Sequence, residues 1–268
     1  MTSRRPLTTA LVAVGAAVAL TACGSTAAPG GTVTSSAATS STASITGTVN
    51  VFAAASLQET FTTLKKNFEA AHPGVTVTPN FGASSALAQQ INQGAPADVF
   101  ASAAQSNMDQ VVQPGGAAGS RPFAKNVMEI AVPPANPAGI ASVNDLAKPG
   151  VKVALCQSQV PCGSVAAKMF ANATITVTPV SQEADVKAVL TKVQLGEVDA
   201  GVVYVTDVKA AGDKVKGIQI APEVNASTSY PIAALTKAPN PDAAAAFVAY
   251  VLSPEGQQVL SAGGFAAP

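Results

Sequence analysis

The stretch from residue 48 to residue 71, TVNVFAAASLQETFTTLKKNFEAA, places a short β-favouring segment directly before an amphipathic helix. Residues 48–53 are mostly apolar or β-branched, as in a buried strand. Four apolar side chains then recur at the spacing of one helix face: Leu57, Phe61, Leu64 and Phe68. The sequence His-Pro-Gly ends this helix, and residues 75–81 alternate apolar and polar side chains as a second strand would. A strand, a helix and a strand in this order predict a layered α/β fold.

The same alternation continues along the chain. Further helices are expected at residues 84–93, 107–112, 142–147, 163–170, 183–193 and 241–252, and further strands at residues 97–102, 127–132, 151–155 and 200–204. Strands that alternate with helices favour a mainly parallel sheet. One large sheet or two smaller α/β lobes would accommodate these elements, and the pattern alone leaves both open.

The composition excludes several classes of protein. Apolar residues make up 48% of the 268 residues and charged residues only 11%, so the chain can bury a large core and is not generally disordered. The 15 basic and 15 acidic side chains give no net charge, and therefore no basic field that would hold nucleic acid. The aromatic content is 4% without any Trp, which argues against base stacking. The single histidine, His72, excludes most histidine-based metal sites.

The N-terminal residues have the composition of a signal peptide. Arg4 and Arg5 precede an apolar run over residues 7–20 that is too short for a comfortable membrane span. The run ends in Leu-Thr-Ala-Cys, which resembles the bacterial lipobox, where the chain is cleaved before the cysteine and the cysteine carries a lipid. We therefore expect a lipoprotein signal peptide over residues 1–22 and a lipidated Cys23. The alternative is an ordinary signal peptide with an incidental cysteine.

A tether is expected between the lipid and the folded body. Residues 24–48 are almost entirely Gly, Ser, Thr, Ala and Pro and carry no charge, as in a flexible linker. Residues 23–46 would then connect a folded body to the outer face of the cell membrane, in an extracytoplasmic location.

Hydroxyl groups stand where two expected strands give way to helices. Ser56 follows the first strand, and Glu59 comes three residues later, which is the spacing of a capping box. Ser84 and Ser85 follow the second strand. Because the carboxyl ends of parallel strands face the ligand crevice and free N–H groups of a helix start attract anions, these serines either cap helices or contact a ligand. Three further candidates lie at comparable points: the helix starts at residues 160–164 and 182–186, and the strand end at Tyr204, which packing alone would also explain.

Seven motifs in order resemble those of the periplasmic molybdate-binding proteins of molybdate ABC importers. They are VNVFAAASL at 49–57, FGASSALAQQI at 81–91, GAPADVFASA at 94–103, VPCGSVAAKMF at 160–170, EADVKAVL at 183–190, GVVYVTDV at 201–208 and SYPIAAL at 229–235. The resemblance implies a type II periplasmic binding protein fold, in which two α/β lobes are joined by two crossings with a ligand cleft between them. Residues 47–125 plus 233–268 would form one lobe and residues 126–232 the other.

The resemblance also implies a ligand set and a role. The molybdate-binding positions of the family fall on Ser56, Ser84, Cys162, Val186 and Tyr204. Ser85 is the alternative hydroxyl donor beside Ser84, and Cys162 departs from the alanine of the family. Molybdenum would be bound only as the oxyanion, molybdate or tungstate, without direct side-chain ligands, further cofactors or catalytic residues. The expected partner is the membrane permease of an ABC importer, and a monomer is expected.

Neutral donors suit this ligand. None of the five positions is Lys or Arg, yet hydroxyls and N–H groups at helix starts can bind a tetrahedral dianion. Donors without acceptors also reject protonated phosphate. Two rival interpretations are a binding protein for another ligand such as sulfate, phosphate or a small organic acid, and a secreted hydrolase, which the absence of a G-x-S-x-G motif disfavours.

Cys156 and Cys162 are expected to form a disulfide. They flank a short loop in a body that lies outside the membrane, where disulfides persist, and Cys23 would be consumed by the lipid. Two unpaired buried thiols are the alternative.

Overall fold

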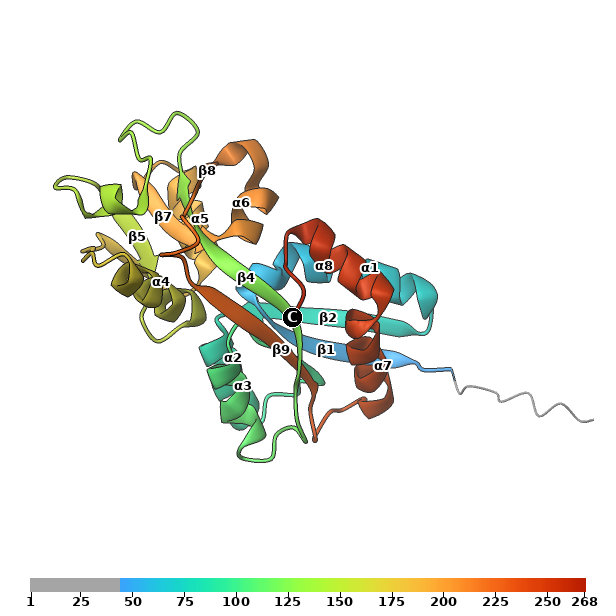
Figure 1. Ribbon diagram of the computed structural model, residues 1–268. Helices are drawn as coiled ribbons and strands as arrows, with labels where there is room; N and C mark the ends of the chain where they lie inside the picture. Colours follow the sequence, from blue (N-terminus) through green and yellow to red (C-terminus); the bar gives the residue numbers. More distant parts are fainter. Residues whose placement is uncertain (1–43) are drawn as a thin grey trace, which may run out of the picture. The chain divides into compact units, whose positions relative to one another are not determined.

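The computed structural model describes residues 44–268. The expected signal peptide, Cys23 and most of the expected tether lie outside the described residues. Residues 44–268 form one compact unit, which contains two α/β lobes (Figure 1). No helix in residues 44–268 is long and apolar enough to cross a membrane.

The first lobe is a three-layer sandwich with a sheet in the middle. Its strands are β1 (Gly47–Ala54), β2 (Val75–Gly82), β3 (Val99–Ala101) and β9 (Ser227–Ala234). Its helices are the 3₁₀ turn η1 (Ala55–Leu57), α1 (Gln58–Ala71), α2 (Ser84–Asn92), α3 (Gln105–Val112), α7 (Pro241–Leu252) and α8 (Pro254–Gly263). Successive strand residues face opposite sides, so Val51 packs with α1, α7 and α8, whereas Phe52 packs with α2 and α3.

The second lobe has its own sheet and core. Its strands are β4 (Arg121–Val132), β5 (Val153–Cys156), β6 (Ser181–Glu183), β7 (Ala200–Tyr204) and β8 (Lys216–Gln219). Its helices are η2 (Val143–Ala147), α4 (Pro161–Asn172), α5 (Val186–Gln194), α6 (Val205–Ala211) and η3 (Gly212–Lys214). Its core draws only on residues from Met128 to Ala226, separate from the apolar clusters of the first lobe.

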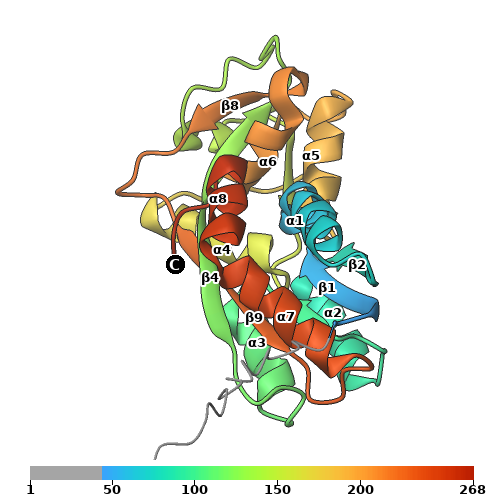
Figure 2. The same cartoon turned by 90° about the vertical axis from the view of Figure 1, so that its right-hand side faces the viewer.

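Two long strands, β4 and β9, connect the lobes. Residues 121–127 of β4 pair with β9, and residues 128–132 pair with β7 and β8. The two strands run side by side between the lobes (Figures 1 and 2). The lobe boundaries expected at 125/126 and 232/233 both fall inside these strands. The segment after α8 also contacts this connection between the lobes, because Ala266 exchanges backbone hydrogen bonds of 2.8 and 3.0 Å with Lys125 of β4.

The sheet is more mixed than the sequence predicts. β1 pairs in parallel with β2 and β3, and β5 pairs in parallel with β6 and β7, as expected. Every antiparallel pairing within residues 44–268 involves β4 or β9. A mainly parallel sheet was therefore wrong for the middle of the molecule, because each crossing strand runs against the strands beside it.

Candidate functional site

A small cavity lies between the two lobes and collects the residues that the sequence singles out. Its volume is about 20 Å³. The first lobe contributes Ala54, Ala55, Ser56, Gly82, Ala83, Ser84 and Ala103, and the second lobe contributes Val160, Pro161, Cys162, Asp185, Val186 and Tyr204. The five expected binding residues are each at most 4% exposed, so the lobes are closed over the cavity. Ser85 is half-buried and does not line it.

Helix starts converge on this cavity. β2 ends just before α2, which begins at Ser84, and α4 and α5 begin at Pro161 and Val186. α2 and α4 have no side-chain cap within the described residues. In α5 the Asp185 carboxylate accepts from the N–H groups of Lys187 and Ala188, at 2.9 and 3.1 Å, and leaves that of Val186 at the head of the helix. The positive ends of three helices thus face one point, which favours an anion.

The hydroxyl of Ser84 is oriented by the backbone. The N–H of Ala103 donates to Ser84 Oγ at 2.9 Å. Since this bond uses the oxygen as an acceptor, the hydroxyl hydrogen remains available for a ligand oxygen.

Tyr204 is the most unusual residue of the site. It is 1% exposed, and its hydroxyl has no hydrogen-bond partner among residues 44–268. Burial raises the pKa of Tyr204, and the neighbouring Tyr230 and Asp207 add to the rise, so the hydroxyl keeps its proton. A buried hydroxyl without a partner costs about 1–3 kcal/mol, which a bound oxygen atom would offset.

Ser56 has a different partner from the one that the sequence predicts. Its hydroxyl lies 2.8 Å from the hydroxyl of Tyr230 in β9, and α1 begins at Gln58 with no side-chain cap within the described residues. The expected capping box of Ser56 and Glu59 was wrong, because each side chain finds a partner distant in sequence. Burial raises the pKa of Tyr230, so this phenol can donate to Ser56 and leave the Ser56 hydrogen for the cavity.

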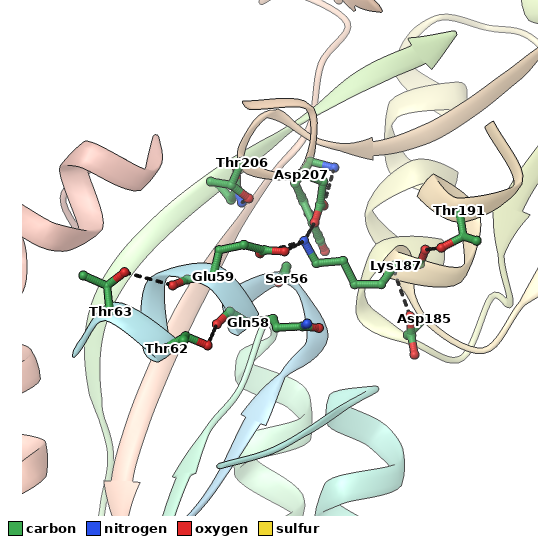
Figure 3. Close-up of polar contacts among 12 residues, drawn as sticks. Ser56, Gln58, Glu59, Thr62, Thr63, Asp185, Lys187, Thr191, Thr206 and Asp207 are labelled. Atoms are coloured by element: carbon green, nitrogen blue, oxygen red, sulfur yellow. Dashed lines mark hydrogen bonds and ion pairs between the residues drawn. The ribbon is translucent and has the colours of Figure 1, made fainter. Parts of the chain in front are cut away.

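A charged cluster lies beside the cavity (Figure 3). Lys187 Nζ is 2.8 Å from Glu59 Oε2 and 2.9 Å from Asp207 Oδ1. The other Asp207 oxygen accepts from the backbone N–H of Tyr204 at 3.1 Å. Burial alone would lower the pKa of Lys187, but the carboxylates of Asp207 and Glu59 outweigh it and raise this pKa, so the ammonium group stays charged. Burial raises the pKa of Asp207 although the ammonium group of Lys187 opposes the rise.

The cavity lining carries little charge. Asp185, whose carboxylate already caps α5, is its single charged lining residue within the described part of the chain. Residues 44–268 contain no group of three or more His, Cys, Asp or Glu that could hold a metal ion.

A disulfide joins Cys156 to Cys162, with an S–S distance of 2.05 Å. The bridge ties the end of β5 to the first turn of α4, where Cys162 lines the cavity. It therefore holds the start of this helix in place beside the cavity.

Sequence patterns alone missed Tyr230 and the partners of Lys187. Asp207 follows Tyr204 by three residues, a capping spacing that could have placed it at the head of α6. Nothing local marks Tyr230 or the pairing of Glu59 with Lys187, since their partners are more than 100 residues away in sequence.

Comparison with known proteins gives a consistent family. The model for bacterial extracellular solute-binding proteins matches residues 49–266. The molybdate-binding protein ModA of Mycobacterium tuberculosis (strain ATCC 25618 / H37Rv) is 43% identical over 219 residues, which is 81% of this chain and 84% of that protein.

Two solved structures share the fold. The periplasmic molybdate-binding protein of Azotobacter vinelandii has a TM-score of 0.73 at 18% identity, covering 82% of this chain and 99% of that one. The sulfate-binding protein SubI of Mycobacterium tuberculosis H37Rv has a TM-score of 0.72 at 19% identity, covering 81% and 86%.

Proposed function

Since the chain belongs to the family of bacterial extracellular solute-binding proteins, we propose that it captures molybdate in the cavity between its lobes and delivers it to an ABC importer. The relatives are solute-binding proteins, and the 43% identical ModA is named for the same ligand. The chain is thus extracytoplasmic and takes part in transport.

The buried hydroxyl of Tyr204 carries the proposal. Tyr204 lines a cavity that Ser56 and Ser84 also line, and its oxygen has no partner among residues 44–268. Three hydroxyls and the N–H groups of Cys162 and Val186 would surround a tetrahedral anion from both lobes. Each hydrogen bond to a charged group contributes about 1.5–3 kcal/mol, so a few suffice for tight binding.

Selectivity follows from the lack of a free carboxylate among the described residues that line the cavity. Molybdate and tungstate are fully deprotonated at neutral pH, whereas phosphate keeps a proton that would need an acceptor. The Asp185 carboxylate already accepts hydrogen bonds from N–H groups in the first turn of α5. It is therefore not available to accept a hydrogen bond from the proton of a phosphate ion. Sulfate also lacks the proton and is smaller than molybdate, so it is the competing oxyanion that the experiment must include. Tungstate, which has nearly the size of molybdate, should bind as well.

Membrane attachment is a further part of the proposal. The order of Arg4, Arg5, the apolar run and Leu-Thr-Ala-Cys supports a lipid on Cys23, which would hold a monomeric body at the outer face of the cell membrane beside its permease. Detergent partitioning of the full chain and Cys23→Ala tests the anchor. Equal release of both into the aqueous phase would contradict it.

The experiment is a ligand comparison on the soluble body from residue 44. Molybdate at 1,000 times its dissociation constant should stabilise the body by about 4 kcal/mol, seen as a rise in melting temperature, and calorimetry should give the affinity. Tungstate should act alike, and phosphate should have no effect. A rise with sulfate alone would reassign the ligand, and no rise with any oxyanion would reject the proposal.

A further inference from the structure

One ion pair joins the lobes directly. Glu59 lies in the first turn of α1 in the first lobe, and Lys187 lies in α5 of the second lobe (Figure 3). Every other ion pair within residues 44–268 joins two residues of the same lobe. The contact between Glu59 and Lys187 therefore depends on how the lobes meet.

Lys187 is fixed in the second lobe regardless of Glu59. Its ammonium group contacts Asp207, which is completely buried, and its own side chain is only 18% exposed. Asp207 is held in turn by the N–H of Tyr204. Because this half of the contact is already ordered, forming it requires the ordering of one side chain only, that of Glu59.

Glu59 is the member of the ion pair that can exchange its contact with Lys187 for contact with water. Its side chain is 49% exposed even in the closed form, so water would solvate it well if the lobes separated. Both carboxylate oxygens reach Lys187 Nζ, at 2.8 and 3.0 Å. The ion pair thus stabilises the closed arrangement of the lobes, and its loss on opening does not disturb the structure of either lobe.

The same cluster touches the binding residues. Lys187 directly follows Val186, and Asp207 holds the backbone of Tyr204. When the ion pair forms, the cavity residues of the second lobe lie opposite those of the first lobe, which include Ser56 and Ser84.

We propose that Glu59 is a positioning residue that sets the residence time of the bound oxyanion, by acting through Lys187 to hold the lobes closed. This inference rests on the proposed function, since the residence time needs a ligand, but the closure itself does not. Glu59 does not line the cavity, and its contact with Lys187 favours the closed form with or without a ligand.

The test compares Glu59 with a matched control. Glu197 is 50% exposed and lies 3.1 Å from Lys192 in the same lobe, so Glu197→Gln and Glu197→Lys repeat the charge changes without touching the lobe contact. Stopped-flow measurement on the soluble body gives the association and release rates of molybdate. X-ray scattering of the ligand-free body gives its radius of gyration.

Glu59→Gln should speed release about two- to fivefold with little change in association, in line with a partly exposed ion pair. Glu59→Lys, which places two ammonium groups face to face, should speed it roughly tenfold or more and enlarge the ligand-free radius. Added salt should speed release from the wild type and leave Glu59→Gln nearly unchanged. The Glu197 variants should match the wild type.

The inference would be overturned if both Glu59 variants released molybdate at the wild-type rate and had the wild-type radius of gyration. It would also be overturned if the Glu197 variants changed these quantities as much as the Glu59 variants do. A wild type that binds no oxyanion would instead refute the proposed function. The radius of Glu59→Lys against the wild type would then decide the closure by itself.

Discussion

Tyr204 and Ser84 differ in what their hydroxyls do in the absence of a ligand. The Tyr204 hydroxyl has no partner among residues 44–268, whereas Ser84 Oγ accepts from the N–H of Ala103. Removing the first hydroxyl therefore leaves no other group unpaired, but removing the second leaves a buried N–H without an acceptor. The two residues should separate affinity from stability.

Tyr204→Phe should weaken molybdate binding about ten- to 150-fold, the equivalent of one hydrogen bond to an anion, and leave the ligand-free protein as stable as before or slightly more so. Ser84→Ala should lose comparable affinity and also about 1–3 kcal/mol of stability. Calorimetry and denaturant unfolding measure the two effects, with Tyr250→Phe, which packs on Phe68 away from the cavity, as control. A ligand-free Tyr204→Phe as destabilised as Ser84→Ala would mean that the hydroxyl has a partner in the protein.

For single residues, the sequence predicted which side chains line the cavity better than it predicted their hydrogen-bond and ion-pair partners. Ser56, Ser84, Cys162, Val186 and Tyr204 do meet around one cavity, because each stands at a strand end or helix start that the periodicity identifies. The capping box failed because Ser56 and Glu59 have stronger partners across the fold, Tyr230 and Lys187. Local spacing cannot register a contact that only tertiary packing creates.

Among the elements, the start of α4 is the most constrained. The Cys156–Cys162 bridge closes the loop before the helix, and Gly163 lies so close to the Gln157 carbonyl that a Cβ would collide with it. The loop backbone therefore packs directly against the first turn of the helix, where Cys162 lines the cavity.

Opening the bridge should loosen this turn. The double variant Cys156→Ala with Cys162→Ala should lose about 2 kcal/mol of stability, as expected for so short a loop, and bind molybdate more weakly. Dithiothreitol should destabilise the wild type by a similar amount and leave the variant unchanged. Intact-mass measurement after alkylation without reductant gives the thiol count, and two alkylated cysteines in the wild-type body would refute the bridge.

The elements themselves were largely predictable. β7 and α7 have the bounds that the apolar pattern gives, since burial on one or both faces dictates them. The antiparallel crossing was not, because residues 121–127 of β4 form their ladder with residues 227–232 of β9. Their pairing depends on the approach of segments about 100 residues apart.

For the whole molecule, the decisive feature is that two lobes with separate cores share two strands. β4 takes part in both sheets, and β9 lies against it along residues 121–127. Unfolding either lobe strips hydrogen bonds from a strand that the other needs, so the lobes should lose structure together.

Calorimetry of the soluble body should accordingly show a single transition whose van't Hoff and calorimetric enthalpies agree. Hydrogen exchange in α1 of the first lobe and in α5 of the second should give matching melting curves. Two resolved transitions would show that the shared strands do not couple the unfolding of one lobe to that of the other.

The pairing of Ala266 with Lys125 bears on how this protein is made. Residues 128–226 are contiguous and hold the buried core of the second lobe, so that lobe can fold before residues 227–268 have been exported. The first lobe begins earlier but is completed only by β9, α7 and α8, which follow residue 226. Until then only α1 covers the apolar face of β1 and β3 that α7 and α8 later share, and the edge of β3 is open to other chains. A chain truncated before residue 227 should thus aggregate through this open edge rather than bind its ligand more weakly.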